Sequence, residues 1–342
     1  MSHIQCSQYK LVFKGELHFG VRRAYDLAMK EWNIRLERHY RTDVLFRQEA
    51  VFNDETLSLS VKVHTVPSAS EKAWKHTVGM LGSMAQFAIM GKIMAWKLEN
   101  GALLESAMIE PTSDKGAAVL FRQGCILLNN GEIEEAAEAL TSVISRYENH
   151  ALAFERRGFT NYKLKNFDDA FRDFSKSIVI KPDLAPSHYG CGKVHMLKNQ
   201  WEEAYTVFTN AQKYSLALES VHWLARLRKS ECLTHLQRFE EAFKEVDAYL
   251  NRKFPEGDYC ASRIPKAYFI KGKALIGLGQ VDAGLDCFLE ARKEAKIRKT
   301  LNMRDQKVVD RFTDPAIASS ACEALRMGQS LDAIMSAQHG DN

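Results

Sequence analysis

The sequence lacks the short motifs that mark many enzyme and metal sites. GxSxG, HExxH and GxxxxGK followed by Ser or Thr are all absent from its 342 residues. A serine-hydrolase elbow, a zinc-peptidase helix and a phosphate-binding loop are therefore not indicated. The 11 histidines are dispersed, and no histidine or cysteine cluster has the spacing of metal ligands. We expect no catalytic residue, no bound metal and no cofactor.

Cysteine is also sparse, with 7 residues and no CxxC pair. An odd and scattered set favours reduced thiols over disulfides or zinc, which is typical of a cytoplasmic protein. The first ten residues have no apolar run behind a positive start, so we expect no signal peptide. Residues 78–96 carry Lys92 as their one charge. They are rich in Met, Ala and Gly rather than Leu, which favours a buried helix that runs into a strand over a membrane span.

The sequence also lacks a large excess of charge of one sign, since it contains 47 basic and 43 acidic residues. The net charge of +4 does not by itself indicate nucleic-acid binding. Two stretches are nevertheless basic: Arg22, Arg23, Lys30, Arg35, Arg38 and Arg41, and then Arg292, Lys293, Lys296, Arg298, Lys299, Arg304, Lys307 and Arg311. Either stretch could contact phosphate or an acidic partner, but a solvated helix face is the usual explanation.

What the chain does contain is a repeat of 34 residues. Small and large apolar residues recur at this interval: Gly124, Gly158 and Gly192; Ala136, Ala170 and Ala204; and Leu140, Phe174 and Phe208. Gly and Ala permit two helices to approach closely, and a bulky residue fills the space beside them. The pattern resembles the tetratricopeptide repeat, a helix–turn–helix unit of the same period.

Five units can be traced in the sequence. They cover residues 117–150, 151–184, 185–218, 223–256 and 265–298. One unit cannot bury its own apolar face, so the resemblance implies an all-α solenoid with an extended groove. Beyond the repeats, Asp314 and Pro315 predict the start of a helix that caps the solenoid, and the last residues are expected to fray.

The residues before about position 111 have no repeat pattern. Alternation and helical spacing there predict a strand at 9–17, a helix at 21–40, a strand or hairpin at 49–66, a helix from a capping box at Ser68 to about Met90, and a hairpin about Asn100-Gly101. This order predicts a compact α+β domain. The chain is thus expected to divide into a small α+β domain at 1–110, a repeat solenoid at 111–298, and a basic segment with a capping helix at 299–342.

The resemblance also implies which residues line the groove, because the first helix of each unit faces it in this family. The matching positions hold Phe121, Glu155, Phe159, Tyr162, Lys163, Tyr189, Lys193, Phe269 and Lys273, together with Cys125, Asn129, Met196, Leu227, Glu231, His235 and Lys266. Aromatic rings supply buried area and lysines supply electrostatic steering. They would suit a peptide with apolar anchors and acidic flanks, although some rings could equally serve packing between repeats.

The leading hypothesis is a non-catalytic adaptor that binds a protein or peptide in this groove. Its first domain would dimerise or make a second contact. A receptor for chaperone tails fits less well, because Tyr189 and Ile270 interrupt the set of basic and amide residues that such members use. Two alternatives stay open: a peptide-sensing or nucleic-acid-binding regulator, and an enzyme whose site is built in the first domain around His18, His39, His64 or His76.

Overall fold

The computed structural model describes residues 8–40, 43–113, 116–255, 257–298, 301–314 and 318–336. The chain divides into two compact units, Met1–Asn166 and Phe167–Asn342. The division falls within the second predicted repeat. The predicted boundary between the first domain and the repeats at residue 110 stays a prediction.

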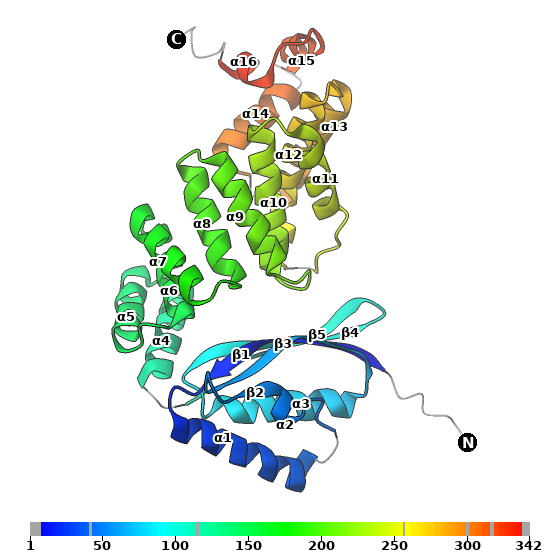
Figure 1. Cartoon of the computed structure of the whole chain (residues 1–342). Helices are drawn as coiled ribbons and strands as arrows, with labels where there is room; N and C mark the ends of the chain where they lie inside the picture. The colour runs from blue at the N-terminus through cyan, green and yellow to red at the C-terminus, as the bar shows by residue number, and fades with distance from the viewer. Residues whose placement is uncertain are drawn as a thin grey trace, which may run out of the picture. The chain divides into compact units, whose positions relative to one another are not determined.

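The first unit begins with an antiparallel sheet of five strands (Figure 1). The strands are β1 (Tyr9–His18), β2 (Phe52–Asn53), β3 (Ser58–Ala69), β4 (Met90–Glu99) and β5 (Ala102–Ile109). Their spatial order is β2-β3-β1-β4-β5, so β1 lies at the centre and β5 at one edge. The predicted hairpin about Asn100-Gly101 is confirmed, since β4 pairs with β5. Both turn residues have the positive φ angles that such a turn requires.

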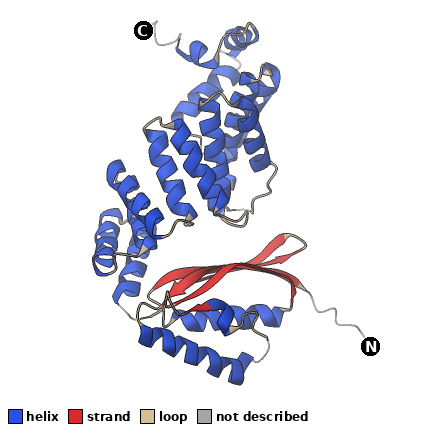
Figure 2. Cartoon of the chain, viewed as in Figure 1, coloured by secondary structure: helices blue, strands red, loops and turns tan. Residues whose placement is uncertain are grey.

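Helices cover one face of this sheet (Figure 2). They are α1 (Arg22–Arg35), which continues into the π-turn η1 (Leu36–Tyr40), then α2 (Gln48–Val51) and α3 (Glu71–Ala85). The core between helices and strands contains Phe13, Trp32 and Trp74, each at most 2% exposed. The predicted α+β class is confirmed.

Two details of this domain differ from the sequence prediction or refine it. The N-cap of α3 is Ser70, whose hydroxyl accepts the Ala73 N–H at 3.1 Å, and not Ser68, which lies in β3. The apolar stretch 78–96 is divided between α3 and β4. In the part of the chain that the structure describes, no helix has the length and apolar character that a bilayer crossing needs.

Paired helices follow the sheet. The first unit contains α4 (Gly116–Asn130), α5 (Ile133–Arg146) and α6 (Ala151–Lys163). The second contains α7 (Phe167–Ile180), α8 (Ala185–Leu197), α9 (Trp201–Lys213), α10 (Ser220–His235), α11 (Phe239–Leu250), the 3₁₀ turn η2 (Ala261–Arg263), α12 (Ile264–Gly277) and α13 (Val281–Arg298). The predicted succession of helix–turn–helix units is confirmed.

The spacing of small residues has the packing role that the sequence predicted. Gly192 on α8 lies against Phe208 on α9, and Gly272 on α12 lies against Phe288 on α13. A Cβ atom added at either glycine would come within 2.6 Å of the facing ring. Glycine at these positions therefore permits the two helices of a unit to approach closely.

The chain after the repeats forms three more helices: α14 (Met303–Thr313), α15 (Ala318–Arg326) and α16 (Leu331–Ser336). The sequence pattern did not predict a helix in the region of α14. Its Phe312 packs against Phe288 with ring centroids 5.9 Å apart, so α14 covers the last repeat. Asp314 follows α14 directly, whereas Pro315 and the predicted frayed tail lie outside the described residues.

Candidate functional site

The first helices of successive pairs in the second unit are α8, α10 and α12, and α14 follows them. α10 contacts both α8 and α12, and α12 contacts α14. These helices present a set of charged and aromatic side chains that we call the first-helix face: Tyr189, Lys193, Arg228, Glu231, His235, Lys266, Phe269, Lys273 and Asp305. Its members come from residues far apart in sequence, and helix packing brings them together.

A chain of ion pairs connects three of these helices. Arg228 Nη1 on α10 lies 2.7 Å from Glu231 Oε2, and Lys266 Nζ on α12 lies 2.6 Å from Glu231 Oε1. The same Lys266 nitrogen lies 2.7 Å from Asp305 Oδ2 on α14. The side chains of Glu231, Lys266 and Asp305 are only 13%, 12% and 9% exposed. Because these side chains are largely removed from water, each charged group depends on its ion-pair partners for stabilisation, and the partners hold one another in place.

The ionisation of Glu231 follows from these neighbours. Burial alone raises the pKa of its carboxyl, but Lys266 and Arg228 outweigh burial and hold the pKa at about 2. Burial raises the pKa of the Tyr189 phenol, while Arg228 opposes this shift. Glu231 is therefore an anion at neutral pH, and it neutralises part of the positive charge around it.

Lys273 lies on the same helix as Lys266 but has no carboxylate of its own. Within the described ranges it takes part in no ion pair, and its ammonium lies 6.0 Å from the centroid of the Phe269 ring. Burial lowers the pKa of Lys273 and Lys266 adds to this effect, while the carboxylates of Asp332, Glu231 and Asp305 oppose it. Lys273 is therefore a cation on the first-helix face without a direct ion pair among the described residues, although carboxylates act on it from a distance.

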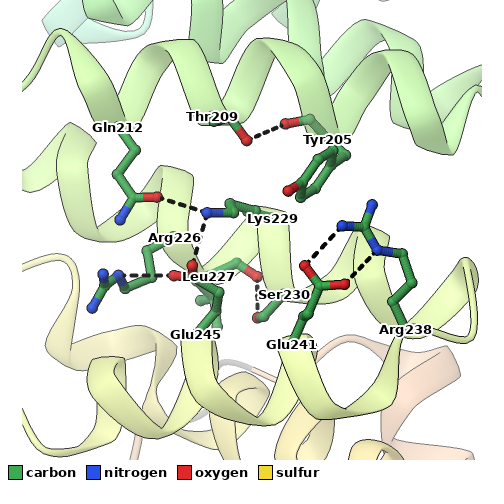
Figure 3. Close-up of polar contacts among 10 residues, drawn as sticks. All are labelled: Tyr205, Thr209, Gln212, Arg226, Leu227, Lys229, Ser230, Arg238, Glu241 and Glu245. Carbon is green, nitrogen blue, oxygen red and sulfur yellow. Dashed lines mark hydrogen bonds and ion pairs between the residues drawn. The ribbon is translucent and has the colours of Figure 1, made fainter.

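A second polar cluster holds α10 in its orientation (Figure 3). Lys229 donates to Gln212 of α9 at 3.3 Å and pairs with Glu245 of α11 at 2.7 Å. Arg226 pairs with the same Glu245 at 3.1 Å. Because these contacts fix α10 between the two second helices, Arg228 and Glu231 are held on the first-helix face.

The aromatic members of this face differ in exposure. Tyr189 is half-buried, and its ring packs on Phe208 with centroids 5.6 Å apart. Phe269 is only 5% exposed and stacks on Phe288. His235 stacks on Trp201 with centroids 3.8 Å apart, and burial lowers the pKa of its imidazole. Tyr189 is thus partly exposed and its binding role stays a prediction, whereas Phe269 packs within its own repeat.

The predicted groove residues of the first unit lie on α4 and α6. Phe121 is 8% exposed and packs against His150, and Glu155 is 6% exposed and lies 3.3 Å from Arg156. Phe159 and Tyr162 are half-buried. The ammonium of Lys163, which is exposed, lies 5.3 Å from the Phe159 ring centroid. Phe121 and Glu155 thus belong to internal packing, and the binding role of the other three stays a prediction.

The histidines of the first domain contact different neighbours. His18 lies 3.2 Å from Glu16, and His76 lies 3.5 Å from Asp43. His64 packs on the ring of Phe46 instead. Throughout the described ranges, no group of three or more His, Cys, Asp or Glu side chains could hold a metal ion.

Several residues of the two basic stretches are paired inside the chain. Arg22 lies 2.9 Å from both Asp26 and Asp54. Arg292 donates to the Thr313 carbonyl at 2.7 Å, and Arg298 lies 2.7 Å from Glu294. Arg41 and Lys299 lie outside the described residues. Part of the basic character of these stretches therefore serves intramolecular contacts.

Known proteins resemble the helical region. The family model for the tetratricopeptide repeat matches residues 121–185 and 192–258, and no family model matches the N-terminal region. A crystal structure of MamA is 16% identical, covering 55% of this chain and 97% of that chain, with a TM-score of 0.43. MamA residues 41-end from Desulfovibrio magneticus RS-1 are 14% identical, covering 54% and 97%, with a TM-score of 0.45. YrrB, a TPR protein with an unusual peptide-binding site, is 17% identical, covering 55% and 99%, with a TM-score of 0.40. The family match and the observed helix pairs identify the helices between residues 121 and 258 as tetratricopeptide repeats.

Proposed function

We propose that this protein is a non-catalytic adaptor that binds a protein or peptide partner on the first-helix face of its second unit. The observation that carries this proposal is that the half-buried Lys273 has no direct ion pair among the described residues. Burial lowers its pKa, and two of the carboxylates that oppose this effect, Glu231 and Asp305, already pair directly with Lys266. A cation that has lost much of its hydration gains most from an opposite charge brought by another molecule.

The chemistry of the partner follows from this charge. An Asp or Glu side chain of a bound polypeptide would neutralise Lys273. The half-buried Tyr189, on α8 of the same face, would contact an apolar side chain of that polypeptide. A protein segment that combines acidic and apolar residues fits this pattern, and it needs no catalytic group on the adaptor.

The rigidity of the face supports a binding role. Glu231, Lys266 and Asp305 link α10, α12 and α14 before any partner arrives. Side chains that are already ordered lose little conformational freedom when a ligand binds, so more of the contact energy appears as affinity. The sheet domain of the first unit would supply dimerisation or a second contact.

Affinity purification of the full chain from its native host tests the proposal. A tagged wild-type protein should retain a stoichiometric protein partner, and Tyr189→Ala combined with Lys273→Gln should lose most of it. Phe159→Ala combined with Tyr162→Ala tests the predicted residues of α6 separately. Each variant is first compared with the wild type by circular dichroism, so that loss of the partner is separated from loss of the fold.

A matched control lies two residues away on α12. Lys271 pairs with Asp247 on α11 at 2.6 Å and does not belong to the first-helix face. Lys271→Gln changes the same formal charge and should leave partner capture intact. If Lys271→Gln and Lys273→Gln reduce capture equally, a general charge effect explains the binding and the assignment of this face is wrong.

A further inference from the structure

The edge strand β5 presents an open and apolar surface. Within the described part of the chain β5 pairs with β4 alone, because it is the last strand in the sheet order. Leu103, Leu104 and Met108 are 41%, 50% and 58% exposed. An edge strand also turns alternate N–H and C=O groups outward, where they can pair with another strand.

The opposite edge of the sheet, formed by β2 and β3, is less suited to pairing with another strand. Among the described residues β2 pairs only with Ser58 and Leu59 of β3, so the rest of that edge of β3 has no strand partner there either. It carries Lys62 and Pro67, which are residues that discourage edge pairing. The sequence of β5, ALLESAMI, contains neither lysine nor proline. The edge at β5 is therefore much better suited to accept another strand.

The charge on β5 is already engaged. Glu105 is the one charged residue of the strand, and its Oε2 lies 2.6 Å from Lys97 Nζ on β4. The register shift between Lys97 and Leu98 leaves Leu104 without a paired residue on β4, and pairing is regular from Glu105 to Ile109. A regular stretch without free charge remains available for pairing.

We propose that β5 pairs antiparallel with β5 of a second copy of this chain, with Ser106 opposite Ser106 at the two-fold axis. This register places Glu105 opposite Ala107 and Leu104 opposite Met108 of the other copy. A register centred on Glu105 would oppose two carboxylates, and one centred on Ala107 would oppose Leu104 and Glu110; each is less favourable. The strand is self-complementary in one register, which favours a second copy over an unrelated strand.

The pairing would join two five-stranded sheets into one continuous sheet. Such an isologous contact closes on itself and yields a dimer rather than a filament. The inference rests on the proposed role of the sheet domain as a dimerisation element. It does not involve the first-helix face, so either proposal can fail without the other.

Cysteine cross-linking of the full chain tests the register. Directly opposed residues of antiparallel strands have Cα atoms about 4.5–5.5 Å apart, which a disulfide can span. Ser106→Cys should therefore form a covalent dimer on mild oxidation. Leu103→Cys is the control, because its counterpart would lie six residues along the ladder, about 20 Å away at roughly 3.4 Å per residue. The wild type, with its native cysteines, should stay uncrosslinked under the same conditions.

Sedimentation equilibrium of the unoxidised wild type gives an independent readout. We expect a dimer for the wild type and for Lys273→Gln, and a monomer for Met108→Lys, which sets a charged ammonium group opposite Leu104 of the other copy at both ends of the ladder. A wild type that stays monomeric throughout the micromolar range would overturn the proposal. Equal cross-linking of Ser106→Cys and Leu103→Cys would overturn it as well. If the protein is monomeric but still captures its partner, the dimer proposal is wrong and the proposed partner-binding function is still supported.

Discussion

Glu231 on α10 and Lys266 on α12 form an ion pair at 2.6 Å, and neither side chain is more than 13% exposed. This pair ties two successive repeats together on the face that we assign to partner binding.

Removing one member of this pair should destabilise the fold strongly. Lys266→Met leaves Glu231 and Asp305 buried without their shared cation, which typically costs about 3–5 kcal/mol. Urea unfolding at neutral pH measures the change. Lys198→Met is the control, since Lys198 pairs with Asp168 at 2.7 Å where both side chains are exposed, and its effect should be close to zero.

The contribution of Glu231 to the stability of the fold should decrease as the pH falls into the acid range. Its pKa in the folded protein is about 2, below the ordinary value of 4.5, because Lys266 and Arg228 outweigh burial. The stabilisation is therefore complete above pH 4.5 and is lost as the pH falls toward 2. Urea unfolding of the wild type and Glu231→Gln at pH 7, 4 and 3 should show a shrinking difference. A difference that is constant over this range would mean that the carboxylate charge is not responsible.

His150 should produce an acid sensitivity of the same sign in the first unit, but at a higher pH. It is 1% exposed, and its Nδ1 accepts the Ala153 N–H at the start of α6, at 3.1 Å. Burial lowers its pKa from 6.5 to about 4, so the folded protein resists protonation. Stability should fall as the pH drops from 6.5 toward 4, by up to about 3 kcal/mol in total.

Asparagine at position 150 can supply the same cap without titrating near neutral pH. His150→Asn should therefore reduce the loss of stability between pH 6.5 and 4, as measured by thermal unfolding of the full chain. If the wild type and the variant lose stability in parallel, other groups cause the effect.

Close helix packing predicts that alanine is unfavourable at one glycine and harmless at another. Gly192→Ala would place a Cβ 2.6 Å from the Phe208 ring, and relief of this overlap should cost about 1–3 kcal/mol. A Cβ added at Gly82 on α3 would have no other atom within 4 Å. Gly82→Ala should therefore be neutral or stabilising by about 0.5–1 kcal/mol. Chemical denaturation compares the two variants, and equal effects would show that the glycine of the repeat is not a packing requirement.

The repeat fold could be predicted because the relevant information is periodic. Gly192 and Phe208 recur with their equivalents every 34 residues, so the spacing itself describes a contact between two helices. The hairpin about Asn100-Gly101 is predictable for a similar reason, since two adjacent residues determine the turn.

The candidate site was only partly predictable. The slots of Glu231 and Lys266 follow from the repeat, but Asp305 lies 39 residues beyond Lys266 on a helix outside the pattern. Burial was not predictable either: Phe121 and Phe269 occupy the same kind of slot as Tyr189 but are 8% and 5% exposed. Exposure depends on the neighbouring helices and on the packing of individual rings, which a single sequence does not specify.

The most direct test of the account is the affinity of the captured partner for two lysine variants of α12. Isothermal titration should give a dissociation constant for Lys273→Gln that is roughly thirtyfold higher than that of the wild type. This corresponds to a loss of about 2 kcal/mol of binding free energy, because a partly desolvated charge pair is lost. Lys271→Gln should bind like the wild type. Equal affinities for Lys273→Gln and the wild type would contradict the claim that this face receives an acidic protein segment.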